Sequence, residues 1–137
     1  MAPLEIAFEE NAAIPVADYR RLRRAVGWGE LPADDGELSA ALARTWNVVA
    51  RHTDEVVAFG RLLDDGLLYA SIWDMIVAPD LQRRGIGNDV LTRLLQHADA
   101  RSLTVLVATR PGRGLYERHG FVPADLASTA MLRRRAR

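Results

Sequence analysis

Six consecutive residues, Gln82 to Gly87, have the residue types and spacing of a loop that binds a phosphate group. They follow Val77-Ala78-Pro79, where a strand is expected to end, and they open a segment with helical periodicity. The first turn of a helix leaves backbone N–H groups without intrahelical partners, and the helix dipole favours an anion at that end. Two glycines in the segment leave room for close approach of an anion, and two arginines add positive charge. The segment therefore predicts a pyrophosphate-binding site.

Two other phosphate-binding patterns fit this segment less well. The dinucleotide-binding fingerprint requires a third glycine at position 90, which is Val90. A P-loop requires Gly-Lys followed by Ser or Thr, and the sequence contains no lysine. A strand ending in Val-x-Pro, followed by Gln/Arg-x-x-Gly-x-Gly/Ala, is the more specific pattern.

A second motif lies further along the chain, at Leu115-Tyr116-Glu117-Arg118-His119-Gly120-Phe121. In this order the two motifs resemble those of the GNAT acyltransferase superfamily. The first looks like its coenzyme A pyrophosphate loop, and the second like its Leu/Phe-Tyr-x-x-x-Gly-Phe segment after the fifth strand. The resemblance covers nearly the whole chain and implies the GNAT fold, with acetyl-CoA as co-substrate and no metal.

A narrower resemblance involves Ile72-Trp73-Asp74-Met75-Ile76-Val77. This segment is similar to the fourth strand of the plastid and cyanobacterial-type arylalkylamine (serotonin) N-acetyltransferases and their bacterial relatives. Val26-Gly27-Trp28 and Phe59-Gly60-Arg61 are similar as well. The resemblance implies an N-acetyltransferase that moves an acetyl group directly, in a ternary complex, to a small primary amine of the arylalkylamine or polyamine type.

The resemblance also implies which residues bind the co-substrate. A bulge in the fourth strand would expose the N–H groups of Met75 and Ile76 to the thioester oxygen, and Val77 would bond the pantetheine arm like an added strand. Tyr116 would contact the coenzyme and protonate the departing thiolate as a general acid. The residues expected at the pyrophosphate are Gln82, Arg83, Arg84, Gly85, Ile86, Gly87 and Asn88.

The proton path departs from the family at two positions. Many GNAT enzymes have a glutamate early in the fourth strand, but the matching residue here is Ser71, which cannot act as the base. Asp74 is the nearest carboxylate, and we expect it to receive the proton of the acceptor ammonium through water. The alternative is a structural role in the bulge. Thr109 stands where the family often has asparagine and the arylalkylamine group an acid.

The acceptor is expected to contact Trp28, Trp73 and Asp74. Trp28 lies in a Gly-Trp-Gly break between the first two helices, where this fold admits substrates. Two alternatives remain open: acetylation of a protein N-terminus or lysine, and a GNAT module that binds acyl-CoA without catalysis. An open peptide groove, in place of a closed pocket around Trp28, would favour a protein acceptor.

Hydrophobic periodicity predicts the elements that must position these residues. The predicted class is α+β, a GNAT fold with a mixed, mostly antiparallel central sheet of six to seven strands and about four helices, in one domain over residues 1–137. Helices are expected at residues 15–26, after a cap at Asp34 or Asp35, at 83–100 and at 114–119. Strands are expected at residues 4–8, 46–51, 56–63, 67–77, 104–108, 121–122 and 130–132, with a hairpin turn at Asp65-Gly66.

Composition excludes several other classes of function. The 137 residues contain no cysteine, so thiolate metal sites and a cysteine nucleophile are excluded. The formal net charge is zero, and the arginine-rich first helix and Arg133 to Arg135 are interpreted as solvated, so no nucleic-acid partner is expected. No segment has the length and apolarity of a signal peptide or membrane span. We expect a cytoplasmic protein without a membrane partner, monomeric or homodimeric.

Overall fold

The structure is a computed structural model that describes residues 3–124 and 130–135. The chain forms two compact units, residues 1–107 and residues 108–137. The first unit contains a β-sheet and the helices on its two faces, and the second contains helix α4 (Arg113–Arg118). That residues 1–137 act as one functional domain stays a prediction.

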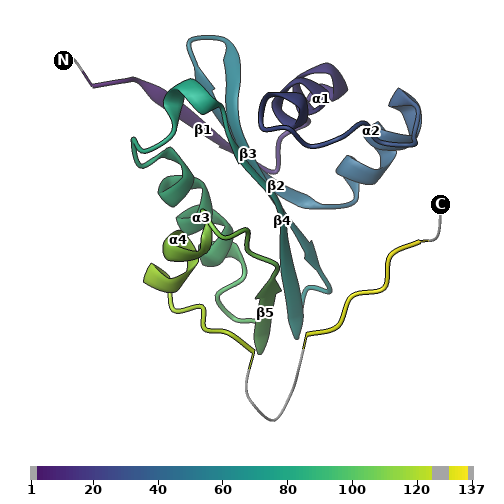
Figure 1. Cartoon of the computed structure of the whole chain (residues 1–137), viewed down its shortest axis with the longest axis vertical. Helices are drawn as coiled ribbons and strands as arrows, with labels where there is room; N and C mark the ends of the chain where they lie inside the picture. Colours follow the sequence, from purple (N-terminus) through teal and green to yellow (C-terminus); the bar gives the residue numbers. More distant parts are fainter. Residues whose placement is uncertain (1–2, 125–129, 136–137) are drawn as a thin grey trace. The chain divides into compact units, whose positions relative to one another are not determined.

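A sheet of five strands, in the order β1-β2-β3-β4-β5, forms the frame of the first unit (Figure 1). Its first four strands pair antiparallel as the predicted meander, and β5 runs parallel to β4. A parallel pair needs a long crossover, which here contains the 3-10 turn η1 (Pro79–Leu81) and helix α3 (Ile86–His97). The strands are β1 (Ile6–Glu10), β2 (Trp46–His52), β3 (Glu55–Asp64), β4 (Tyr69–Val77) and β5 (Leu103–Leu106).

The hairpin between β3 and β4 is fixed by Asp65 and Gly66, as the sequence predicts. The Asp65 carboxylate accepts hydrogen bonds from the backbone N–H groups of Leu67, Leu68 and Tyr69. Gly66 has a φ of 79°, in the left-handed region that glycine adopts without strain. The turn therefore sets the register of the two strands that carry the candidate site.

Helices α1 (Val16–Ala25) and α2 (Asp35–Ala43) cover one face of the sheet. The expected cap is Asp34, whose carboxylate accepts a hydrogen bond from the Glu37 N–H while the Glu37 carboxylate accepts one from the Asp34 N–H. Burial of apolar side chains between the helices and the sheet is the main stabilising contribution here. The buried residues are Ile14, Tyr19, Leu22, Leu38, Leu42, Val49, Val56, Phe59 and Ile76.

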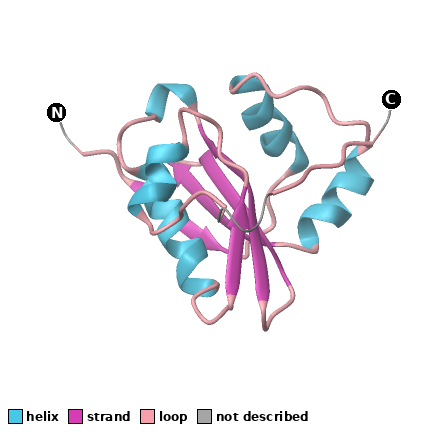
Figure 2. Cartoon of the chain, turned by 60° about the horizontal axis from the view of Figure 1, so that its bottom comes forward, coloured by secondary structure: helices cyan, strands magenta, loops and turns pink. Residues whose placement is uncertain are grey.

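Helix α3 covers the opposite face, so helices lie on both sides of the strands (Figure 2). Its buried row is Ile86, Val90, Leu91 and Leu94. Gly60 allows β3 to approach this helix closely. A Cβ atom at Gly60 would lie 2.6 Å from Met75 Sδ and 2.9 Å from Leu94 Cδ1. The absence of a side chain at Gly60 is therefore a packing requirement.

The second unit corrects part of the predicted sheet. Helix α4 ends at Arg118, and Gly120, two residues later, has the φ of 88° of the expected left-handed cap. The strands predicted at 121–122 and 130–132 are wrong, because these residues have no regular secondary structure. The described residues thus contain five strands instead of six or seven. Two adjacent apolar residues show no alternation that would distinguish a strand from a loop.

In residues 3–124 and 130–135, no helix combines the length and the apolar character that spanning a bilayer requires.

Candidate active site

A β-bulge lies at Asp74 and Met75, in the middle of the site that the sequence predicts. Phe59 pairs with Ile76 and Arg61 pairs with Trp73, so that two residues of β4 lie opposite the single residue Gly60. Asp74 adopts a φ of 56°, which is unusual for a residue other than glycine. A bulge of this kind re-aims side chains and interrupts the hydrogen-bond ladder. Here the Asp74 side chain meets α1, and Met75 lies on the α3 face.

Backbone groups beside the bulge are directed toward an open strand edge. The Ala78 N–H donates to the Val57 carbonyl, and antiparallel ladders alternate, so the N–H group of Val77 points away from β3. Ile76 lies in register with Phe59, and the same alternation directs its N–H toward β3. Met75 lies in the bulge, where this alternation is interrupted, so the role of its N–H as an oxyanion donor stays a prediction.

The pairing of β5 leaves that edge uncovered. Strand β5 pairs with β4 over Tyr69 to Ile72, and no strand of the described residues pairs with Trp73 to Val77 on this side (Figure 1). The Gln82 side chain reaches back to the edge and donates to the Val77 carbonyl at 3.1 Å. An extended ligand could add to this edge as a further strand would.

The loop after η1 has the backbone conformation of an anion site. Arg83 and Gly85 have φ values of 64° and 83°, so the chain turns through the left-handed region twice before α3. Such turns direct successive N–H groups into one concavity. Helix α3 begins at Ile86, not at Arg83 as predicted, because these two residues are not helical. Its N-terminus has no side-chain cap, which leaves the first turn able to bind an anion.

The predicted pyrophosphate residues fall into two groups in this loop. Gln82, Arg83, Arg84 and Gly85 form the exposed turn, and Ile86, Gly87 and Asn88 form the first turn of α3. Ile86 is buried in the core and anchors the helix start. The loop thus presents backbone N–H groups and two exposed guanidinium groups on a rigid support.

Asp74 lies at the centre of a cluster of charges on the α1 face. One carboxylate oxygen, Oδ2, accepts hydrogen bonds from the Tyr19 hydroxyl at 2.7 Å and from Arg61 Nε at 2.8 Å. The other, Oδ1, accepts one from an Arg23 terminal nitrogen at 3.4 Å. Burial, followed by the charge of Asp74 and its hydrogen bond, raises the pKa of Tyr19. The phenol therefore remains a donor at neutral pH, and its acceptor is the bulge carboxylate.

The two aromatic residues predicted to contact the acceptor, Trp28 and Trp73, lie apart from the third tryptophan of the chain, Trp46. The Trp28 ring lies 5.3 Å from the Arg23 guanidinium carbon, and Trp28 packs at the margin of the core between α1, α2 and the sheet. Trp73 is 44% exposed, and its indole nitrogen donates to the Ser71 hydroxyl at 2.7 Å. Trp46 instead stacks on His97 of α3, with ring centroids 3.9 Å apart. Trp28 and Trp73 thus lie near the charge cluster, and Trp46 does not.

Tyr116 belongs to α4 in the second unit. Its ring contacts Phe121 edge to face, with centroids 6.0 Å apart. Burial raises the pKa of the Tyr116 phenol, which keeps the hydroxyl protonated at neutral pH. Thr109 accepts a hydrogen bond from the Gly112 N–H through its carbonyl. Tyr116 therefore has the protonation state that a general acid requires.

Three residues of the charge cluster were missed by the sequence interpretation. Tyr19 and Arg23 are four residues apart and lie on the same face of α1. That spacing places Arg23 beside the buried Tyr19 ring, whereas the arginines of this helix were interpreted as solvated. Arg61 follows Gly60, which faces the bulge. The spacing of Tyr19 and Arg23 indicates that they are neighbours on one helix face. Their contact with Asp74 depends on the tertiary fold and could not be predicted from spacing.

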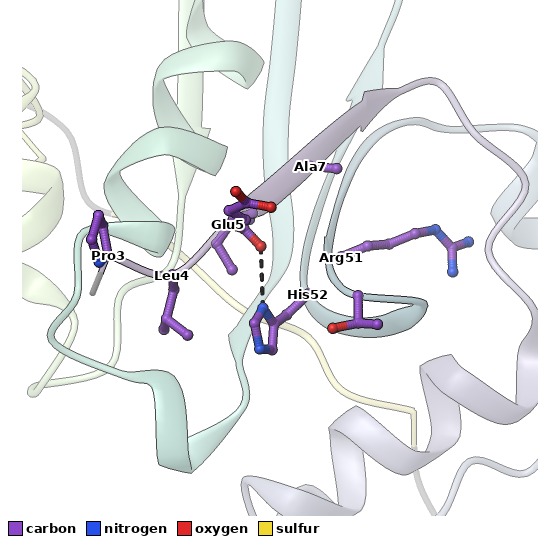
Figure 3. A pocket seen from close by; sticks show the side chains of 8 residues that line it. Pro3, Leu4, Glu5, Ala7, Arg51 and His52 are labelled. Atoms are coloured by element: carbon purple, nitrogen blue, oxygen red, sulfur yellow. Dashed lines mark hydrogen bonds between the residues drawn. The ribbon is translucent and has the colours of Figure 1, made fainter. Parts of the chain in front are cut away.

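A separate cavity of about 780 Å³ lies between β1 and the turn after β2 (Figure 3). His52 Nδ1 lies 3.1 Å from the Glu5 carbonyl oxygen at its wall. The other lining residues are Pro3, Leu4, Ile6, Ala7, Arg51 and Thr53. This cavity contains none of the predicted site residues. In the described part of the chain, no three His, Asp or Glu side chains are grouped as metal ligands.

Comparison with known proteins gives one family match. The profile of the family described as "Acetyltransferase (GNAT) family" matches residues 10–121. The match includes the bulge, the loop before α3 and Tyr116, and it ends at Phe121.

Curated relatives include plant proteins of greater length. "GCN5-related N-acetyltransferase 1, chloroplastic" of Arabidopsis thaliana is 33% identical over 95 residues, covering 65% of this chain and 48% of the relative. "Serotonin N-acetyltransferase 2, chloroplastic" of Oryza sativa subsp. japonica is 28% identical over 113 residues, covering 81% of this chain and 51% of the relative. The chain spans about half the length of these two relatives.

Solved structures share the fold. A probable acetyltransferase of unknown function from methicillin-resistant Staphylococcus aureus superposes with a TM-score of 0.84 at 21% identity. The superposition covers 96% of this chain and 100% of the other. The α+β class and the GNAT-like arrangement predicted from the sequence are confirmed, with fewer strands than expected.

Proposed function

The chain belongs to the acetyltransferase (GNAT) family, and from that premise we propose that it transfers an acetyl group from acetyl-CoA to the primary amine of a small molecule. In the proposed reaction, the thioester supplied by acetyl-CoA reacts so that a C–N bond forms and the C–S bond breaks, while the acceptor ammonium loses two protons, one to the departing thiolate and one to solvent.

The observation that carries the proposal is the order of three features that suit the co-substrate: the bulge, the open end of β4 and the loop before α3. After η1, the double left-handed turn of Arg83 and Gly85 has N–H groups suited to a pyrophosphate. At the open end of β4, the Val77 N–H would bond a pantetheine amide. At the bulge, the Met75 N–H would stabilise negative charge on the thioester oxygen.

Two side chains, those of Tyr116 and Asp74, are proposed to donate or accept protons in the reaction. The Tyr116 phenol, which burial keeps protonated, would donate to the leaving thiolate. Asp74 accepts three hydrogen bonds already, so we propose that it fixes the bulge and α1 and receives the acceptor's proton through water. Ser71 is engaged with Trp73 and offers no charged group.

Among small primary amines, we propose an arylalkylamine or a polyamine as the acceptor. The name of the rice relative and the aromatic rings of Trp28 and Trp73 beside the cluster support it.

A thiol-release screen with acetyl-CoA tests the proposal. The panel contains arylalkylamines, polyamines, amino acids and a peptide with a free N-terminus and a lysine. Thiol release with at least one small amine, and a slower reaction with the peptide, is the expected result. Release with the peptide alone would support the protein-acceptor alternative instead.

A further inference from the structure

The charges around the bulge do not cancel. Arg23 and Arg61 contribute two positive charges, and the carboxylate of Asp74 contributes one negative charge. Among the residues that the structure describes, the ion pairs of both arginines are with Asp74 alone. The cluster therefore carries a net charge of one positive unit.

The side chains that carry this surplus charge are largely buried. The side chains of Arg23, Arg61 and Asp74 are 17%, 19% and 10% exposed. Arg23 Nε is buried and has no hydrogen-bond partner in the described part of the chain. A buried cation without a full set of acceptors is costly, and buried donors are nearly always satisfied. An anion bound to the accessible guanidinium atoms of the cluster would supply the missing charge.

The surplus lies where the acceptor must approach the acetyl group. Asp74 belongs to the bulge itself, and its side chain lies on the α1 face, while the backbone edge proposed for the coenzyme is the one directed toward β5. The Arg23 guanidinium also lies over the Trp28 ring, and the neighbouring Trp73 is partly exposed. An acceptor entering beside these rings would lie next to the two arginines.

We propose that Arg23 and Arg61 bind a carboxylate of the acceptor, so that the acceptor class is small amines that also carry a carboxylate, such as amino acids. The inference rests on the proposed acetyl transfer to a small primary amine, and it replaces the polyamine class with amines that carry a carboxylate. Guanidinium groups match the planar, two-oxygen geometry of a carboxylate. A monoanion balances one surplus charge, whereas a phosphate monoester, with a charge of about −1.5 to −2, would overcompensate it.

The same charge disfavours amines that are only cationic. A polyamine would bring further ammonium groups beside two guanidinium groups at short distance and in a poorly hydrated place. A carboxylate next to the amine reverses this balance, with its oxygens toward the arginines and its nitrogen toward Asp74 and the bulge. Arg23 and Arg61 are thus assigned as specificity-determining residues.

The test compares matched pairs of amines with wild-type protein. L-Tryptophan is compared with tryptamine, and L-lysine with cadaverine, because each pair differs by one carboxylate. The kcat/KM values are referred to the concentration of unprotonated amine, since the members of a pair differ in amine pKa. The carboxylate-bearing member is expected to be favoured by about tenfold or more, as for a charge-assisted bidentate contact.

The Arg61→Gln variant tests whether Arg61 causes the preference for the carboxylate-bearing amine, and Arg24→Gln is its control. Arg24 is also on α1, is 57% exposed and pairs with Glu30 outside the cluster. Arg61→Gln should lower kcat/KM for tryptophan by about tenfold, mainly through KM, and that for tryptamine by less than about threefold. Arg24→Gln should leave both values within about twofold.

The possible results distinguish a failure of the carboxylate assignment from a failure of the proposed acetyl transfer. A wild-type preference for tryptamine and cadaverine would overturn the carboxylate assignment and leave the proposed acetyl transfer standing. Equal losses for both amines in folded Arg61→Gln would overturn it as well, because a purely structural residue acts on both. If that variant does not fold, the wild-type ratio decides. Absence of thiol release with every amine would overturn the proposed function together with this inference.

Discussion

The hydroxyl of Tyr19 donates a 2.7 Å hydrogen bond to Asp74 Oδ2, across 55 residues of sequence. The bond joins the first helix to the bulge of β4. Arg23, one turn further along α1, reaches the other oxygen of the same carboxylate. The break that carries Trp28 follows directly after α1, so this contact also fixes the part of the chain proposed to admit the acceptor.

Gly85 is predicted to be required for coenzyme binding. Its φ of 83° costs an L-residue about 1–2 kcal/mol, but a Cβ atom there would meet no protein atom within 4 Å. Gly85→Val should therefore fold, with coenzyme A affinity in calorimetry reduced by about tenfold or more because the side chain occupies the phosphate position.

Gly66 offers a matched control for this substitution. It has a φ of 79° and equally open surroundings, but it lies in the β3–β4 turn. Gly66→Val should show a similar loss of stability and unchanged coenzyme affinity. Unchanged affinity in folded Gly85→Val would remove the pyrophosphate assignment.

Tyr116→Phe is predicted to lower kcat more than it raises KM. The phenol is proposed to protonate the thiolate, and general acid catalysis contributes about 10²- to 10⁴-fold. Burial raises the pKa of Tyr116, so wild-type activity should not decline on the basic side below about pH 10 through loss of this proton. Stopped-flow measurement of the chemical step gives the relevant rate.

The control for Tyr116 is Tyr69→Phe, which changes an exposed tyrosine of β4. This variant should retain wild-type kcat. A loss below about threefold in Tyr116→Phe, with chemistry rate-limiting, would mean that the tyrosine packs or positions the coenzyme without donating a proton.

Much of the fold, but less of the site, could be predicted from the sequence. The turn at Asp65-Gly66 and the cap at Asp34 depend on local hydrogen bonds, so local patterns suffice to place them. The left-handed conformation of Arg83 was not predicted, because arginine has no local preference for it. The tertiary contacts around Asp74 depend on a register shift between two strands, which periodicity alone does not give.

Asp74→Asn is predicted to lower kcat/KM for the best amine by about tenfold at neutral pH. The substitution keeps the shape of the side chain but removes the charge that holds Arg23 and Arg61. The loss should shrink as the pH approaches the pKa of the amine, about 10, where free amine needs no base. The measurement is a pH–rate profile of both proteins.

Tyr19→Phe separates the structural part of the Asp74 role from its charge. It removes one hydrogen bond to the carboxylate and leaves both arginines in place. If Asp74→Asn has the neutral rate and the basic limb of wild type, Asp74 is structural and the proton leaves by another route. A Tyr19→Phe rate close to wild type, with a low Asp74→Asn rate, would assign the effect to charge.

Tyr19 also gives a prediction for stability at high pH. Its pKa is raised in the folded state, by burial first and then by Asp74, so the folded protein retains a proton that the unfolded chain loses. This contribution is complete below the unfolded pKa of about 10 and is lost as pH rises through the folded value.

Urea denaturation between about pH 8 and pH 11 measures this contribution as the difference between wild type and Tyr19→Phe. The advantage of wild type should be constant up to about pH 10 and should then decrease. An advantage that grows above that pH would contradict the assigned direction of the shift.

Isotopically labelled acetyl-CoA, incubated with the protein alone and with the best amine of the screen, tests the central claim most directly. Mass spectrometry then follows the amine and the intact protein, while thiol release is measured in parallel. Direct transfer in a ternary complex predicts labelled N-acetyl amine in an amount equal to the released thiol, with no acetyl group on the protein in either incubation. Binding of acetyl-CoA without acetylation of any amine would contradict the claim and would identify the chain as a non-catalytic acyl-CoA-binding module.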